Sequence, residues 1–169
     1  TTPPQTDPAI PQTTYYYLLS EQTAEIIEVD PENGQQTRRF QLPIDKAGAE
    51  GLTFVPNADV VTFGLFGLEP SPNGGYFLVS VQEDGTIFVV DVPLAGVGGT
   101  VVIPLSFTIP SLDEDASSLA YHNGTIWVAM AKKERLYAVA SNFANGEVVV
   151  QAQHNLKELP FDAEDTEGV

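Results

Sequence analysis

The stretch FQLPIDKAGAEGL at residues 40–52 recurs twice in this 169-residue chain, as FTIPSLDEDASSL at 107–119 and as KELPFDAEDTEGV at 157–169. Each copy has an aliphatic residue before a proline, and seven residues past the proline come a polar, a small and an aliphatic residue in succession. Successive prolines are 67 and 50 residues apart. A period near 50 is typical of the four-stranded blades of β-propellers. The repeat therefore predicts a fold built from radially arranged sheets.

Between the three copies, short apolar segments alternate with turn signals, as in all-β proteins. The Asn-Gly pairs at 33–34, 123–124 and 145–146, and Asp-Gly at 84–85, predict hairpins. Type I′ turns need positive φ at both central residues, which Asn and Gly tolerate. The predicted strands are 15–20, 24–29, 36–42, 52–55, 76–81, 86–92, 101–109, 118–121, 126–131, 135–140 and 147–153.

We therefore predict an all-β protein made of β-propeller blades, each of four antiparallel strands. Residues 1–14 contain four prolines and predict an extended linker or tail. Residues 15–169 predict about three blades, of which the first lacks its inner strand, while the last residues begin a further blade. The Gly- and Pro-containing segment 57–75 predicts an insertion between the first two strands of the middle blade.

Three blades are too few for a closed ring, since propellers typically use 4–8. Two arrangements remain open. The chain is a fragment of a larger ring, or copies join into an oligomer. In a six-bladed pair, the terminal TEGV segment of each copy would pair with the strand that begins at Tyr15 of its partner.

The charge of the chain is strongly negative, because 23 Asp and Glu face 7 Lys and Arg, for a formal net charge of −16. Nucleic acid and anionic membranes are bound through Lys and Arg, so neither is an expected partner. Membrane insertion is not expected either, because no apolar run approaches the length of a spanning helix. Cysteine is absent, which excludes disulfides and thiolate metal sites.

One family resemblance covers roughly residues 15–169. The segment DASSLAYHNGTIWVAMAKKERLYAV (115–139), followed by LPFDAEDTEGV (159–169), resembles a blade of the extracellular propellers called SdiA-regulated, or phytase-like with esterase-like activity. The segments 50–56 and 74–93 fit the same template. The resemblance implies an extracellular, cell-surface or periplasmic protein, and a phytase-type reaction would depend on Ca²⁺. One departure is Ser117-Ser118, which replaces the Glu-Gly of the other two copies.

Carboxylates gather at the repeat junctions, which in a propeller converge near the axis. Ca²⁺ takes six to eight oxygen ligands, and converging carboxylates repel one another without a cation. The alternative is that the Asp residues form Asx turns and that the Glu residues hydrogen-bond neighbouring blades. The predicted Ca²⁺ ligands are Glu50, Asp113, Asp115, Asp165 and Glu167.

Other candidate sites carry weaker patterns. Asn123-Gly124-Thr125 fits the N-glycosylation sequon, with an ordinary hairpin turn as the alternative. Ser117 lacks the G-x-S-x-G context of serine esterases. His122 and His154 stand 32 residues apart without metal-ligand spacing.

The function that this sequence favours is non-catalytic. We expect an exported propeller that binds a protein partner, a glycan or its own copies, with Ca²⁺ as a structural ion. The alternatives are a Ca²⁺-dependent phytase-like or esterase-like hydrolase and a structural subunit of an extracellular assembly.

Overall fold

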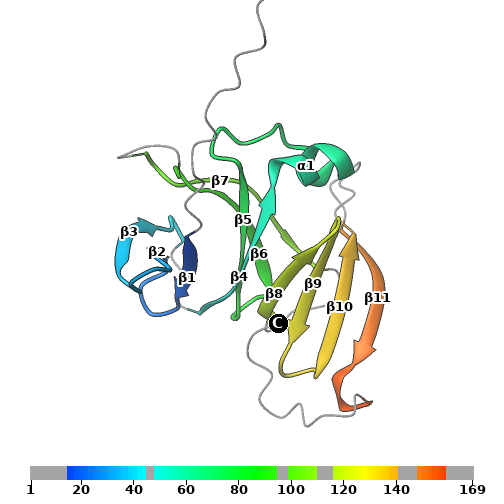
Figure 1. Ribbon diagram of the computed structural model, residues 1–169. Helices are drawn as coiled ribbons and strands as arrows, with labels where there is room; N and C mark the ends of the chain where they lie inside the picture. Colours follow the sequence, from blue (N-terminus) through cyan, green and yellow to red (C-terminus); the bar gives the residue numbers. More distant parts are fainter. Residues whose placement is uncertain (1–14, 45–47, 95–98, 110–115, 141–147, 159–169) are drawn as a thin grey trace, which may run out of the picture.

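Three antiparallel sheets form the chain in its computed structural model, which describes residues 15–44, 48–94, 99–109, 116–140 and 148–158 (Figure 1). Sheet 1 consists of β1 (Tyr16–Ser20), β2 (Glu25–Val29) and β3 (Gln36–Gln41). Sheet 2 consists of β4 (Ala49–Pro56), β5 (Gly75–Val81), β6 (Thr86–Asp91) and β7 (Val102–Thr108). Sheet 3 consists of β8 (Ala116–His122), β9 (Thr125–Met130), β10 (Arg135–Ala140) and β11 (Val149–Asn155). The short helices are α1 (Asn57–Phe63), η1 (Leu65–Gly67) and η2 (Leu156–Glu158).

Each sheet is a meander, in which strands pair in the order of the chain. The all-β prediction is confirmed, and the predicted strands of the described segments form with ends within a few residues of those expected. The predicted tail, 1–14, lies outside the described residues. So does the turn predicted at 145–146.

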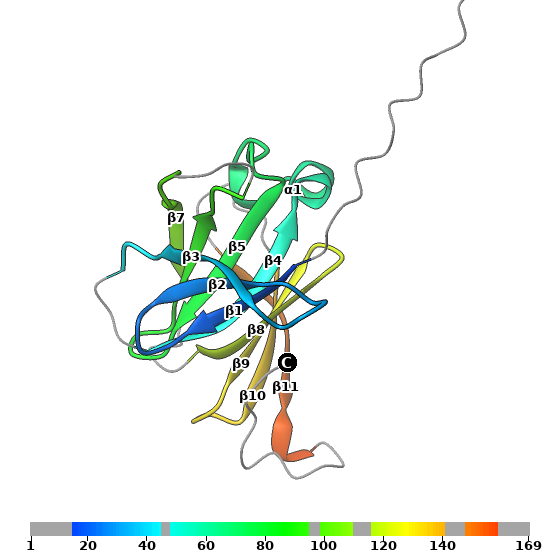
Figure 2. The same cartoon turned by 60° about the vertical axis from the view of Figure 1, so that its left-hand side comes forward.

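Sheet 2 lies between the other two sheets, as the burial of β5 shows. All seven residues of β5 are buried, which is unusual for a strand with only one covered face. Its alternate residues divide between two hydrophobic cores: Tyr76 and Leu78 pack in the core shared with sheet 3, while Phe77 and Val79 pack in the core shared with sheet 1. Both faces of the middle sheet are therefore covered by a neighbouring sheet (Figure 2).

The sheets approach one another most closely at one edge. The strand β4 contacts β1 of sheet 1 and β8 of sheet 3, and β8 also contacts β5. The strands β4 and β8 are the first strands of their meanders. The first strands of sheets 2 and 3 therefore lie side by side, next to β1.

The segment between β4 and β5 is an insertion, as predicted, but it contains a short helix, α1, that was not predicted. Tyr121 of β8 donates a hydrogen bond to Asp59 of α1 at 2.9 Å and accepts one from the backbone N–H of Gly124. A β-carbon at Gly124 would lie 2.9 Å from the ring of Phe63. The insertion thus joins sheet 2 to the β8–β9 hairpin.

Candidate functional site

A cavity of about 470 Å³ opens where β1, β4 and β8 meet. Its volume lies within the usual range for ligand pockets. The lining comes from these three strands and from the turns that follow β1, β5 and β9, and it consists of Tyr17, Leu18, Leu19, Glu21, Ala49, Glu50, Gly51, Leu52, Gln82, Ser117, Ser118, Leu119 and Ala131.

Two β-bulges shape the polar part of this lining. The register between β4 and β5 shifts between Ala49 and Gly51, so Glu50 is an extra residue in its strand. The register between β8 and β9 shifts in the same way between Ala116 and Ser118, so Ser117 is the extra residue. A bulge redirects the side chain of its extra residue and ends regular pairing. Equivalent positions of the sequence repeat therefore form equivalent bulges, and both line one cavity.

The small residue that follows the first bulge, Gly51, has a steric reason. Gly51 lies against β8, where a β-carbon would come within 2.9 Å of the backbone nitrogen of Leu119 and closer still to Ser80 Oγ. The Gly51 N–H donates to this buried Ser80 hydroxyl at 2.9 Å. The glycine of the repeat thus allows the two inner strands to pack closely, which places their bulges side by side.

Ser117 is engaged with its own sheet. Its hydroxyl donates to the backbone carbonyl of Ala129 at 3.2 Å. Of the two histidines, His122 ends β8 at the hairpin and His154 lies beside the Trp127 ring, with centroids 6.1 Å apart. Neither belongs to the described lining of the cavity. A serine nucleophile paired with a histidine base is therefore not formed by these residues.

Of the predicted Ca²⁺ ligands, only Glu50 is among the residues that the structure describes. Glu50 lines the cavity, together with a second carboxylate, Glu21. The other predicted ligands, Asp113, Asp115, Asp165 and Glu167, lie outside the described residues. Within the part of the chain that the structure describes, no three His, Asp or Glu side chains gather closely enough to hold a metal. The Ca²⁺ site stays a prediction.

A second polar cluster, which no sequence pattern indicated, supports the β1 side of the cavity. The buried carboxylate of Glu28 on β2 forms an ion pair with Arg38 on β3 and accepts hydrogen bonds from Tyr17 at 3.0 Å and Thr37 at 2.6 Å. Arg38 also donates to the backbone carbonyl of Leu94, in the connection that follows β6 of sheet 2, at 3.0 Å. The cluster therefore fixes Tyr17 at the cavity and ties sheet 1 to sheet 2.

Burial and hydrogen bonding act in opposite directions on the pKa of Glu28, but in the same direction on the pKa of Tyr17. Burial raises the pKa of Glu28, but the hydrogen bonds from Arg38, Thr37 and Tyr17 outweigh it, so the pKa lies below its ordinary value. Burial and the hydrogen bond to Glu28 raise the pKa of Tyr17 to about 12. The Tyr17 hydroxyl therefore stays protonated, and a donor, throughout the physiological range.

The predicted glycosylation site lies at the opposite end of β8. Asn123 is exposed in the β8–β9 turn, with positive φ at both Asn123 and Gly124, as a type I′ turn requires. The turn prediction is confirmed here, and the use of the sequon stays a prediction.

Comparison with known proteins adds no relative. The sequence matches no model of a known protein family and no curated protein. The resemblance to phytase-like propellers therefore stays a prediction. Among the residues that the structure describes, no helix has the length and apolar character needed to cross a membrane.

Proposed function

We propose that the chain is a non-catalytic, exported interaction module made of β-propeller blades, and that it binds an extended segment of a protein partner in the cavity between β1, β4 and β8. The observation that carries this proposal is the position of the cavity. It lies against β1, which among the described strands pairs only with β2. An unpaired strand edge is a template for a further strand.

The arrangement of the sheets supports blades rather than an ordinary sandwich. Sheets 2 and 3 are successive meanders that begin at equivalent positions of the sequence repeat, and their first strands, β4 and β8, contact one another. Blades of a propeller are arranged in this way around an axis, with the first strand of each blade innermost.

The lining of the cavity suits a peptide. Leu18, Leu19 and Leu52 offer apolar contacts, while Glu50 and Gln82 offer polar ones. In β-strand addition, backbone hydrogen bonds supply affinity, and pockets for alternate side chains supply specificity. Glu50 and Glu21 would favour a partner that places a cation near the bulges. Alternatively, a Ca²⁺ ion held by Glu50 and further junction carboxylates would supply the positive charge near the bulges.

The proposal is tested by selecting linear peptides from a displayed random library on the wild-type chain. Selected peptides should shift the amide resonances of β1, β4 and β8 in a saturable way. Leu18→Lys, a change within the lining, should abolish this binding. Val61→Lys is the matched control, because Val61 is an exposed valine on α1, outside the cavity. Shifts confined to other parts of the chain, or no selected peptide, would contradict the proposal.

The hydrolase alternative is tested on the same protein with p-nitrophenyl phosphate and p-nitrophenyl acetate in CaCl₂. We expect no turnover above buffer. Turnover that disappears on chelation and in Glu50→Gln would overturn the non-catalytic proposal in favour of a Ca²⁺-dependent hydrolase.

A further inference from the structure

The inner position of sheet 1 can be located by comparing the turns of the three sheets. A four-residue turn follows β1, β5 and β9, and the fourth residue of each has positive φ: Ala24 at 50°, Gly85 at 66° and Glu134 at 49°. The strand β1 therefore corresponds to β5 and β9. In sheets 2 and 3 this strand pairs with an inner strand, β4 or β8, whereas in sheet 1 no described strand holds that place.

The edge of β1 at this vacant place is apolar and accessible. Tyr16 is 60% exposed and Leu18 is 55% exposed, although both belong to a strand. Tyr17, Leu18 and Leu19 all line the cavity. Natural proteins seldom leave such an edge uncovered, because it pairs readily with another strand.

The sequence of the chain supplies a segment that matches the vacant place. Residues 49–52, Ala-Glu-Gly-Leu, begin β4, and residues 116–119, Ala-Ser-Ser-Leu, begin β8. The third copy of the repeat ends in Thr-Glu-Gly-Val at 166–169. Its Glu167 and Gly168 stand where the bulge residue Glu50 and the closely packed Gly51 stand in β4.

The layering of the sheets indicates which molecule provides this segment to β1. Sheet 2 packs on sheet 1 with one face and on sheet 3 with the other, so successive sheets advance in one direction. A strand that follows β11 by the same step would lie beyond β8, on the side of sheet 3 away from β1. A second copy of the chain can present such a strand to β1.

We propose that two copies of this chain associate, and that residues 166–169 of each copy pair with the free edge of β1 in the other. This proposal rests on the proposed function, because it names the partner of the same cavity. The two contacts are identical and related by a twofold axis, so the assembly closes as a pair.

The outer faces of sheets 1 and 3 support the same association. In sheet 3, Trp127 lies in one row with Ala120, Ala138 and Ala152, on the face opposite the core residue Ile126. Trp127 remains partly exposed, since no described element covers this apolar row.

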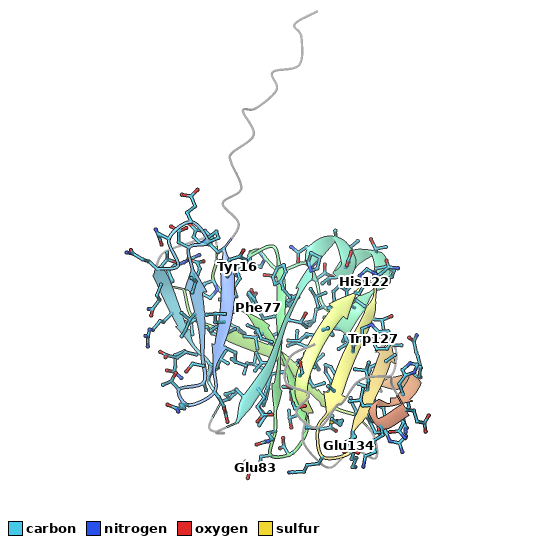
Figure 3. The ribbon with its side chains drawn as sticks, turned by 60° about the horizontal axis from the view of Figure 1, so that its bottom comes forward. Tyr16, Phe77, Glu83, His122, Trp127 and Glu134 are labelled. Carbon is cyan, nitrogen blue, oxygen red and sulfur yellow. The ribbon has the colours of Figure 1, made fainter. Side chains whose placement is uncertain are left out.

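In sheet 1, the face opposite Ile26 carries Tyr16, Leu18 and Ile27. Figure 3 labels Tyr16 on sheet 1 and Trp127 on sheet 3, the two sheets that lie on either side of sheet 2. When the terminal segment of one copy pairs with β1 of the other, sheet 3 of the first copy meets sheet 1 of the second. The aromatic and aliphatic side chains of the two faces then bury one another.

The association is tested by light scattering coupled to size exclusion over a range of concentrations, in high salt to screen the net charge of −16 on each copy. Wild type should approach twice the chain mass of 18.2 kDa. Leu18→Lys and Trp127→Glu should each weaken the association about tenfold or more, because each buries a charge in the contact. Val61→Lys should associate as wild type does. A monomer at every concentration, or an association that neither interface variant weakens, would overturn the proposal.

A synthetic peptide of residues 157–169 separates this inference from the proposed function. This peptide should bind the wild-type chain at the cavity and bind Trp127→Glu equally well. It should also compete with the association of wild-type copies. A scrambled peptide should neither bind nor compete. If library peptides bind at β1 but the 157–169 peptide does not, the second copy is the wrong partner and the interaction module stands. If no peptide binds at β1 and association persists, β1 is not the site and both proposals fail.

Discussion

Glu28 is a carboxylate that sequence patterns assign to the surface, since it alternates with the apolar residues of β2. In the structure it is only 2% exposed, and three side chains donate hydrogen bonds to it. Removing one partner of a buried ion pair costs more than the pair contributes, because the remaining charge loses its compensation. Here that remaining charge, Arg38, is about one-third exposed, which moderates the cost.

We predict that Glu28→Gln lowers the free energy of unfolding by about 2 kcal/mol at neutral pH, which is typical for a lost hydrogen bond to a charged group. The folded-state pKa of Glu28 is lowered, so its contribution is present above the ordinary pKa near 4.5 and is lost as the pH falls through the folded value. The variant should therefore lose less stability than wild type on acidification. Urea unfolding at several pH values measures both effects.

Glu25→Gln is the control for this prediction, because Glu25 also lies on β2 and pairs with an arginine of β3, Arg39, at 3.2 Å. That arginine is more than half exposed, and exposed pairs contribute little. Equal losses in the two variants would show that burial does not set the importance of Glu28.

Gly51 is predicted to be the least replaceable glycine of the site. Gly51→Ala should cost about 3 kcal/mol, because the new methyl group meets backbone of β8 that cannot move aside without separating the inner strands. Gly34→Ala should cost about 1 kcal/mol, since Gly34 has φ of +69° but open space around it. Thermal unfolding compares the two, and a smaller loss for Gly51→Ala than for Gly34→Ala would contradict the close approach.

At the scale of elements, the four-residue turns after β1, β5 and β9 share one backbone shape, although only one of them has glycine at the left-handed position. Ala24 and Glu134 adopt positive φ at an energetic cost of about 1–2 kcal/mol. The turns face the same end of the molecule, as Glu83 and Glu134 illustrate in Figure 3. The sheets therefore impose the conformation on turns whose residues do not favour it.

We predict that Glu134→Gly is more stable than Glu134→Ala by about 0.5–1 kcal/mol. Both changes remove the ion pair between Glu134 and Lys157, so the difference isolates the backbone strain at this position. Urea unfolding of the two variants is the measurement. Greater stability of the alanine variant would mean that the turn changes shape once the carboxylate is gone.

The strands could be predicted because β-branched and aromatic residues cluster between glycine-containing turns, and local chemistry decides both features. The Asn33-Gly34 turn was predicted wrongly as type I′. Only Gly34 has positive φ, because the Asp30 carboxylate accepts hydrogen bonds from Glu32 and Asn33 and organises a longer loop. Helix α1 has seven residues, too few for a helical period to appear in the sequence.

The residues of the cavity also differ in how far the sequence indicates them. Glu50 was named as a site residue because of its repeated position, and the structure places it in the cavity lining together with Ser117, the residue that stands at the same position of the second copy. Tyr17 and Gln82 were missed as cavity residues, because neither belongs to the repeated stretch and only the packing of different sheets brings them to the cavity. A sequence contains no local signal for such contacts.

For the whole molecule, the dominant feature is the net charge of −16, because 23 Asp and Glu outnumber 7 Lys and Arg. Like charges held on one compact surface repel, and unfolding lets them separate. Added salt screens this repulsion, since the Debye length falls from about 10 Å at 0.1 M to about 3 Å at 1 M. Stability should therefore rise with ionic strength.

We predict that the melting temperature rises steadily with NaCl, and that CaCl₂ at matched ionic strength raises it further only where Ca²⁺ is bound at a site. MgCl₂ is the control for divalent charge, because Mg²⁺ demands a smaller octahedral site than the junction carboxylates and carbonyls would form. If the extra effect of CaCl₂ disappears in Glu50→Gln and persists in Glu83→Gln, Ca²⁺ is bound in the cavity. Equal effects of the two divalent salts on all three proteins would assign the stabilisation to screening alone, and a melting temperature that falls with NaCl would contradict the charge argument itself.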